Sequence, residues 1–275
     1  MKIIKNLLSL FWQDIINLIH LSPKKTDDPS VNIYAKELKK EGIIKIPNFL
    51  TSDLCDELRN EIENFSAQYP TSIELENGTK LNYRGQHSDK ASDSGMLDIF
   101  FIEKSIPRIA TINQEKLIQI LTATTGQQII PLRANAYLNN GIKNTRGYHI
   151  DNTQPVIYKA FVYLVNVPDL SYGPYSFVKR SHQFSLYSYL SLIKNLFSTR
   201  FSYTDMSLYN KERVQHCIGN KGDLILSSQN GIHRGLPQED GKKRVALILS
   251  FMVKSKLSYI HQSAKENISQ KNDKK

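Results

Sequence analysis

The spacing of apolar residues changes near residue 128, and this change restricts the possible folds more than any other feature of the sequence. Before it, apolar residues recur at helical intervals, as at Leu54, Leu58, Ile62 and Phe65, in a helix that we expect to begin near Ser52. Beyond it, runs rich in Val, Ile, Leu, Tyr and Phe are bounded by Gly, Pro, Asn or Asp, as strands are. These runs cover 129–138, 156–167, 223–227 and 244–253. Helices followed by strands predict one α+β domain with a β-sandwich or barrel core.

Weaker signals fill in the remaining elements. They predict a strand over 43–46 and helices over 113–122 and 183–198. Two other stretches, 71–94 and 201–219, carry polar turn residues or irregularly spaced aromatic residues and predict no regular structure.

The chain is expected to have three parts. Residues 1–30 form an amphipathic helix and a polar linker, residues 31–254 form the folded domain, and residues 255–275 form a basic, flexible tail. In the first twenty residues polar positions recur every three or four residues, which leaves a wide apolar face. We expect this helix to pack on its own domain; contact with a membrane surface or a partner is the alternative.

Composition excludes several classes of protein. The chain has 275 residues, of which 40% are hydrophobic and 23% charged, and no apolar run is long enough to cross a membrane. The two cysteines, Cys55 and Cys217, cannot build a disulfide framework, so we expect a cytoplasmic protein. The net charge is +10, but part of it lies in the tail, and no nucleic-acid-binding motif accompanies it. We therefore expect no nucleic-acid partner.

The segment GYHIDN, residues 147–152, contains the first candidate metal ligands. On an extended strand alternate residues share a face, so His149 and Asp151 project to the same side and could bind one metal ion. An isolated His-x-Asp triplet is more often an ordinary surface or core pair, so the interpretation needs a third ligand.

Among the seven histidines, His233 has the surroundings of that third ligand because it lies between two predicted strands. Two imidazoles and one carboxylate leave three positions of an octahedral metal open, which is the 2-His-1-carboxylate arrangement of Fe(II) oxygenases. The other histidines have weaker contexts. We expect solvent exposure for His20 and His261, a polar loop for His87, a loop-bracing role for His182, and no strand around His216.

Arg244 opens the second of those strands, eleven residues after His233. A guanidinium group matches a carboxylate with two parallel hydrogen bonds. A dicarboxylic 2-oxo acid could chelate the metal at one end while Arg244 binds its other carboxylate. The alternative is a surface arginine in the Lys-Lys-Arg turn.

Residues 148–182 and 222–251 resemble the phytanoyl-CoA dioxygenase family of Fe(II)/2-oxoglutarate oxygenases, and the likeness extends over about 34–253. The resemblance implies a double-stranded β-helix, the jelly-roll barrel of cupin-like proteins, flanked by N-terminal helices. It also implies a set of site residues: His149, Asp151 and His233 as catalytic iron ligands, Arg244 as the 2-oxoglutarate-binding residue, and Asn135, Tyr137 and Phe161 as cofactor-binding residues. Ordinary barrel packing is the alternative for Tyr137 and Phe161.

The implied activity is a dioxygenase (hydroxylase) reaction with Fe(II), 2-oxoglutarate and O2, in which a small organic molecule is hydroxylated and succinate and CO2 are released. Asp151 favours hydroxylation, since related halogenases leave this carboxylate position empty. Two departures from the family pattern concern the substrate: Tyr148 stands where many relatives have Trp, and Lys179 and Arg180 replace the Pro-Gly of a PGSH loop. The alternative function is a catalytically silent jelly roll that binds a metal or small ligand.

Overall fold

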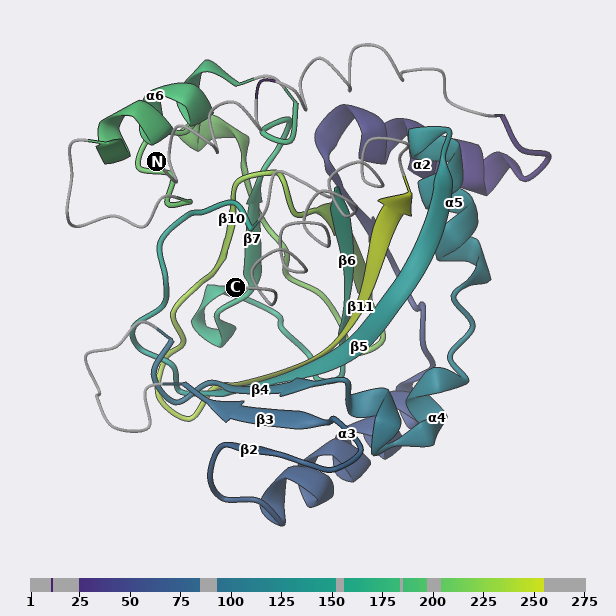
Figure 1. Ribbon diagram of the computed structural model, residues 1–275, viewed down its shortest axis with the longest axis vertical. Helices are drawn as coiled ribbons and strands as arrows, with labels where there is room; N and C mark the ends of the chain where they lie inside the picture. The colour runs from purple at the N-terminus through teal and green to yellow at the C-terminus, as the bar shows by residue number, and fades with distance from the viewer. Residues whose placement is uncertain are drawn as a thin grey trace, which may run out of the picture.

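The computed structural model describes residues 25–84, 93–151, 156–183, 185–196 and 204–254, together with Phe11. Two antiparallel sheets face each other (Figure 1). The larger sheet has the order β1 (Ile43–Ile46), β9 (Leu224–Ser228), β6 (Ile157–Tyr163), β11 (Lys243–Lys254), β5 (Gln128–Asn140), β4 (Leu97–Phe100), β3 (Lys80–Tyr83) and β2 (Ile73–Glu74). The smaller sheet has the order β10 (His233–Gly235), β7 (Tyr175–Val178) and β8 (Val214–His216). The predicted double-stranded β-helix is therefore confirmed.

Helices cover the outer face of the larger sheet. They are α2 (Pro29–Glu41), α3 (Ser52–Ala67), α4 (Pro107–Ala110) and α5 (Glu115–Thr125), whereas α6 (Leu186–Leu196) lies beside the smaller sheet. Figure 1 shows α2 and α5 side by side against β5 and β11, with α3 and α4 below them.

Helix α2 begins inside the segment predicted to be a linker. The Asp28 carboxylate accepts hydrogen bonds from the backbone N–H groups of Ser30 and Val31, and proline at the first position is already set for a helix. The helix ends at Gly42, whose φ of 80° suits glycine. A Cβ atom at Gly42 would also lie 2.3 Å from His182 Nδ1, so no other residue fits this close approach.

Strand β11 shows how the larger sheet separates two cores. Its residues Val245, Leu247, Leu249 and Phe251 belong to the apolar core under the helices. The alternating residues Ala246 and Ile248 belong to a second core between the two sheets, which also contains Phe161, Tyr163, Tyr175, Phe177 and Ile225. This second core is the barrel interior, and side chains that share its face of the sheet point toward the candidate site.

The four long β runs and the strand over 43–46 lie where the sequence predicted them, as do the helices over 113–122 and 183–198 with shifts of a few residues at their ends. Two predictions of irregular structure are wrong. The stretch 71–94 contributes β2 and β3, which pair with each other and extend the larger sheet through β4. His216 closes β8, in which it pairs with Ser176.

The first amphipathic helix and the basic tail lie outside the described residues, apart from Phe11, and the three-part division of the chain stays a prediction. Within the described part, no helix has the length and apolar character that membrane crossing requires.

Candidate metal centre

The three predicted metal ligands converge at the end of the barrel. His149 and His233 form an antiparallel bridge in which each backbone N–H donates to the other residue's carbonyl, at 3.0 and 2.9 Å. Residues paired in this way project their side chains to the same side, and the two imidazole centroids are 4.6 Å apart. Asp151 follows the bridge, and its N–H donates to the Gln229 carbonyl. One ligand atom from each residue lies within 4.8 Å of the others.

Both imidazoles direct the same nitrogen, Nε2, toward the place where the three ligand atoms meet. His149 Nδ1 lies 2.8 Å from the Gly147 carbonyl, and His233 Nδ1 lies 2.9 Å from the Gly231 carbonyl. A carbonyl can only accept, so each Nδ1 carries the proton and each Nε2 keeps a free lone pair. This is the tautomer that a metal-binding histidine needs, with its orientation fixed by the second hydrogen bond.

Asp151 faces both free nitrogens with one oxygen. Its Oδ1 lies 3.5 Å from His149 Nε2 and 3.6 Å from His233 Nε2, while its Oδ2 lies 2.6 Å from Lys159 Nζ. Neighbouring donor atoms of one metal ion lie about 3 Å apart when each metal–donor bond is near 2.1 Å. The Asp151 oxygen and the two nitrogens therefore need to approach one another only slightly to bind a metal ion.

The protonation states suit metal binding. Burial lowers the pKa of His149, which keeps the ring neutral. Burial opposes ionisation of Asp151, but the adjacent Lys159 ammonium outweighs it and holds the pKa of this carboxyl well below its usual range. Neutral imidazole and ionised carboxylate are the forms that bind divalent metals.

Arg244 lies inside the barrel, away from every carboxylate that the structure describes. The residue is 8% exposed, and its Nη1 atom is buried without a hydrogen-bond partner. Among the described residues no acidic side chain lies within ion-pair distance of it. Gly235, the last residue of β10, leaves room for the guanidinium, because a Cβ there would lie 3.2 Å from Arg244 Nη2. An unpaired buried guanidinium is costly, so this group fits the distal carboxylate of a 2-oxo acid.

The three weaker cofactor-binding predictions fall on the inner face of the barrel. Asn135 is buried, and its Oδ1 accepts from the N–H of Phe101. Tyr137 is half-buried and packs against the barrel core. Phe161 stacks on Tyr175 with the ring centroids 4.5 Å apart. These positions suit both co-substrate contact and ordinary packing, so the assignments stay predictions.

Two neighbours of the ligands were not predicted from the sequence. Lys159 contacts Asp151, and the Tyr175 ring lies 5.6 Å from that of His233 while its hydroxyl contacts Ser227. The sequence did carry a signal for the first: Lys159 is the only charged residue in the apolar run 156–165. A lysine that alternates with Phe161 and Tyr163 in such a run points inward.

The segment after β7 caps the metal centre. Tyr148 and Ile150, which flank His149, share a buried cluster with Leu192 of α6 and with Met206. The Tyr148 ring also packs on Tyr209, 4.4 Å between centroids. Tyr189 and Tyr209 therefore pack against the cluster that contains Tyr148, whereas Tyr187 is exposed.

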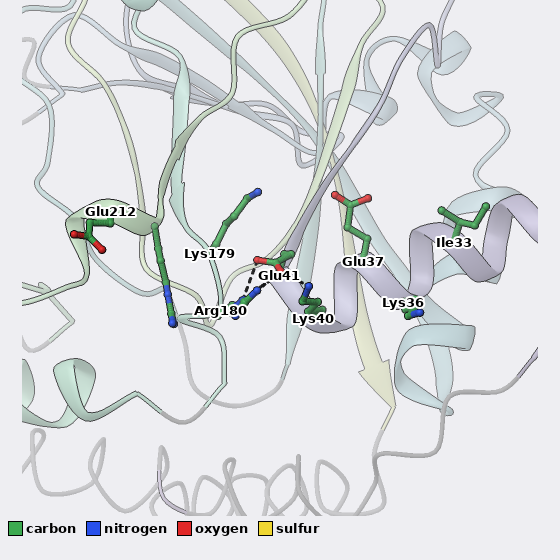
Figure 2. A pocket seen from close by; sticks show the side chains of 9 residues that line it. Ile33, Lys36, Glu37, Lys40, Glu41, Lys179, Arg180 and Glu212 are labelled. Carbon is green, nitrogen blue, oxygen red and sulfur yellow. Dashed lines mark hydrogen bonds and ion pairs between the residues drawn. The ribbon is translucent and has the colours of Figure 1, made fainter.

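His182 and Arg180 hold the turn after β7 against α2. His182 Nε2 donates to the Lys39 carbonyl at the end of α2, as the predicted bracing role requires. Arg180 adopts a φ of 65° and forms an ion pair with Glu41 in an open groove of about 780 Å³ (Figure 2). The groove lies between α2 and these turns, and none of the predicted site residues lines it.

Comparisons with known proteins agree with this geometry. No family profile matches the sequence, and no curated protein matches it. Solved structures do match. The epimerase SnoN in complex with Fe3+, alpha ketoglutarate and nogalamycin RO has a TM-score of 0.57 at 15% identity, over 82% of this chain and 85% of that one.

Two further structures are similar to the same degree. EvdO2 from Micromonospora carbonacea var. aurantiaca, complexed with 2-oxoglutarate, has a TM-score of 0.59 at 13% identity, over 84% of this chain and 92% of its own. The alpha ketoglutarate-dependent carbocyclase SnoK from nogalamycin biosynthesis has a TM-score of 0.61 at 14% identity, over 80% and 83%. This chain therefore has the fold of non-haem iron, 2-oxoglutarate-dependent enzymes, and it places a His-Asp-His cluster in the barrel.

Proposed function

We propose that this protein is an Fe(II)- and 2-oxoglutarate-dependent dioxygenase of the phytanoyl-CoA dioxygenase type. It would hydroxylate a small organic substrate and release succinate and CO2. The observation that carries the proposal is the presence, in one barrel, of a preassembled His-Asp-His cluster and a buried guanidinium with an unpaired nitrogen. Neither feature alone requires 2-oxoglutarate, but together they match both ends of a chelating dicarboxylate.

The similar structures support the same co-substrate. SnoN was solved with Fe3+ and alpha ketoglutarate, and HygX from Streptomyces hygroscopicus with nickel and 2-oxoglutarate. SnoN and SnoK act on small molecules of nogalamycin biosynthesis, which supports a small-molecule substrate here. The two buried cysteines, Cys55 and Cys217, are unpaired and are consistent with a cytoplasmic location.

Each residue has a role in this scheme. His149, Asp151 and His233 hold the metal on one face, and Arg244 binds the distal carboxylate of the co-substrate. Asn135 and Tyr137 line the co-substrate side, and Phe161 excludes water from it. When bound, ferrous iron with 2-oxoglutarate and O2 supplies the oxidising power for C–H hydroxylation. The protein contributes orientation, a dry pocket and charge complementarity.

A catalytically silent metal- or ligand-binding module is the second candidate. The same three ligands could hold a metal ion for binding alone, and a zinc hydrolase could use a similar set. Arg244 argues against both, because neither needs a buried cation set back from the metal.

The test combines binding and turnover. Under anaerobic conditions, Fe(II) with 2-oxoglutarate should produce a visible charge-transfer band in the wild-type protein, and O2 should then yield succinate. His233→Ala should lower succinate release by more than about a hundredfold. His216→Ala is the matched control, because His216 lies outside the site and should leave both signals unchanged. A wild-type protein that binds metal but gives neither band nor succinate would favour the silent module.

A further inference from the structure

Lys159 is a charged side chain inside the barrel whose role the proposed function leaves open. It lies on β6, two residues before Phe161, and both side chains point between the two sheets. Its ammonium is 2.6 Å from Asp151 Oδ2, and the lysine side chain is only 19% exposed. Its cross-strand neighbours are Ser250 on β11 and Ser227 on β9, both small enough to leave room for the lysine stem.

The two oxygens of Asp151 have different environments. Oδ1 faces the free nitrogens of His149 and His233, at 3.5 and 3.6 Å. Oδ2 accepts a hydrogen bond from Lys159 at 2.6 Å. A carboxylate with no such partner can rotate and offer both oxygens to a metal, which would occupy two coordination positions instead of one.

Among the described residues, Lys159 pairs with Asp151 alone. In the parts of the chain that the structure describes, Asp151 is the only carboxylate within ion-pair distance of its ammonium. Burying an ammonium is costly unless it is paired, so the contact with Asp151 explains why a lysine is tolerated at this inward position.

We infer that Lys159 is a positioning residue that fixes Asp151 as a monodentate ligand and so keeps the adjacent coordination position free for the 2-oxo acid. The inference rests on the proposed function, since it assumes that Asp151 binds the metal. Hydrogen-bond partners of metal ligands contribute to metal affinity by orienting the ligand before the metal arrives.

The test uses metal alone, so that it does not depend on turnover. Anaerobic titration with Co(II) gives a dissociation constant, and its visible ligand-field spectrum reports the coordination number. Lys159→Met keeps the length of the side chain but removes the charge and the donor. It should weaken Co(II) binding by about ten- to a hundredfold and change the intensity of the spectrum. Lys159→Arg, which keeps a cationic donor, should restore most of the affinity and the wild-type spectrum.

Lys45→Met is the matched control. Lys45 also pairs with a buried aspartate, Asp223 at 2.8 Å, but on β1 outside the site, so its loss should leave Co(II) affinity and spectrum unchanged. If Lys159→Met does not fold, Lys159→Leu replaces it with the same expected direction, because leucine also lacks the charge and the donor. Unchanged affinity and spectrum in the folded Lys159 variant would overturn the inference. Failure of the wild-type protein to bind Co(II) would instead overturn the proposed function.

Discussion

The two faces of the larger sheet differ in what they bury. The outer face, under α2, α3 and α5, is packed with apolar side chains, and Val245, Leu247, Leu249 and Phe251 of β11 are all at most 1% exposed there. The inner face of the same strand also buries Arg244 and Ser250. One strand with period-two alternation thus serves two purposes: its outward residues stabilise the fold, and its inward residues prepare a ligand site.

The inner face also has buried polar atoms without partners. Arg244 Nη1, Ser250 Oγ, Gln229 Oε1 and Asn139 Oδ1 all lack a hydrogen bond. Asn139 is directly across the strand pair from Arg244. Such groups destabilise a core unless something binds them, so the facing pair of Arg244 and Asn139 indicates where a ligand belongs.

The largest expected effect is on the outer face. Phe251→Ala should lower the free energy of unfolding by about 3–5 kcal/mol, because it leaves a cavity in the apolar core. Chemical denaturation measures the loss, and Phe251→Leu should lose less because the cavity is smaller. Co(II) affinity of the folded fraction should not change. If Phe251→Ala also lowered the Co(II) affinity of the folded protein, the outer face would contribute to the site, and the two faces would not have separate roles.

His182 gives a smaller, pH-dependent effect away from the metal centre. Burial lowers the pKa of His182 from its ordinary 6.5 to about 4. Between pH 6.5 and pH 4 the imidazole is therefore protonated in the unfolded chain but neutral in the folded protein. The neutral ring's contribution is complete above pH 6.5 and is lost as the pH falls toward 4, by on the order of 3 kcal/mol.

The measurement is the free energy of unfolding at pH 7.5 and pH 5 for wild-type and His182→Gln proteins. The variant lacks the titrating group, so its stability should fall less over this interval. If the free energy of unfolding fell equally in the two proteins between pH 7.5 and pH 5, His182 would be able to take up a proton in the folded state.

Arg244→Met tests the inner face. Loss of the guanidinium should raise the dissociation constant of 2-oxoglutarate by about ten- to a hundredfold, the range for a charge-assisted bond of about 1.5–3 kcal/mol. The free energy of unfolding should stay unchanged or rise, since an apolar side chain of similar size replaces an unpaired buried cation. Calorimetry with metal-loaded protein and denaturation measure the two quantities. If the variant were strongly destabilised and bound 2-oxoglutarate normally, Arg244 would stabilise the fold and would not bind the co-substrate.

Ser250→Ala should have the smallest effect. Its hydroxyl is buried without a partner, so removing it should change the free energy of unfolding by less than about 0.5 kcal/mol, or raise it slightly. Thermal denaturation of the two proteins checks this. A loss above 1 kcal/mol would mean that the hydroxyl has a partner that stabilises the barrel.

Much of this arrangement could be predicted from residue spacing. Alternation placed His149 and Asp151 on one side, and turn residues placed His233 between strands, with Arg244 at the start of the second strand. The short strands β2 and β3 could not be predicted, because they have only two and four residues, apolar and polar mixed, and they form by pairing at the edge of the sheet. Helix α2 was hidden by a polar start that resembles a linker until Asp28 is seen to cap it.

The sequence by itself determined the alternation of the strands, the choice of ligand-type side chains and the presence of one lysine and one arginine in apolar runs. Only the tertiary structure decided that His233 meets a histidine 84 positions earlier, because that meeting depends on two backbone hydrogen bonds between segments distant in the chain. The same holds for Lys159. Alternation along β6 predicts that its side chain points inward, but only the tertiary structure brings it to Asp151, because β6 packs beside the segment after His149. Period-two alternation fixes which face a side chain occupies, and the packing of sheets fixes what it touches there.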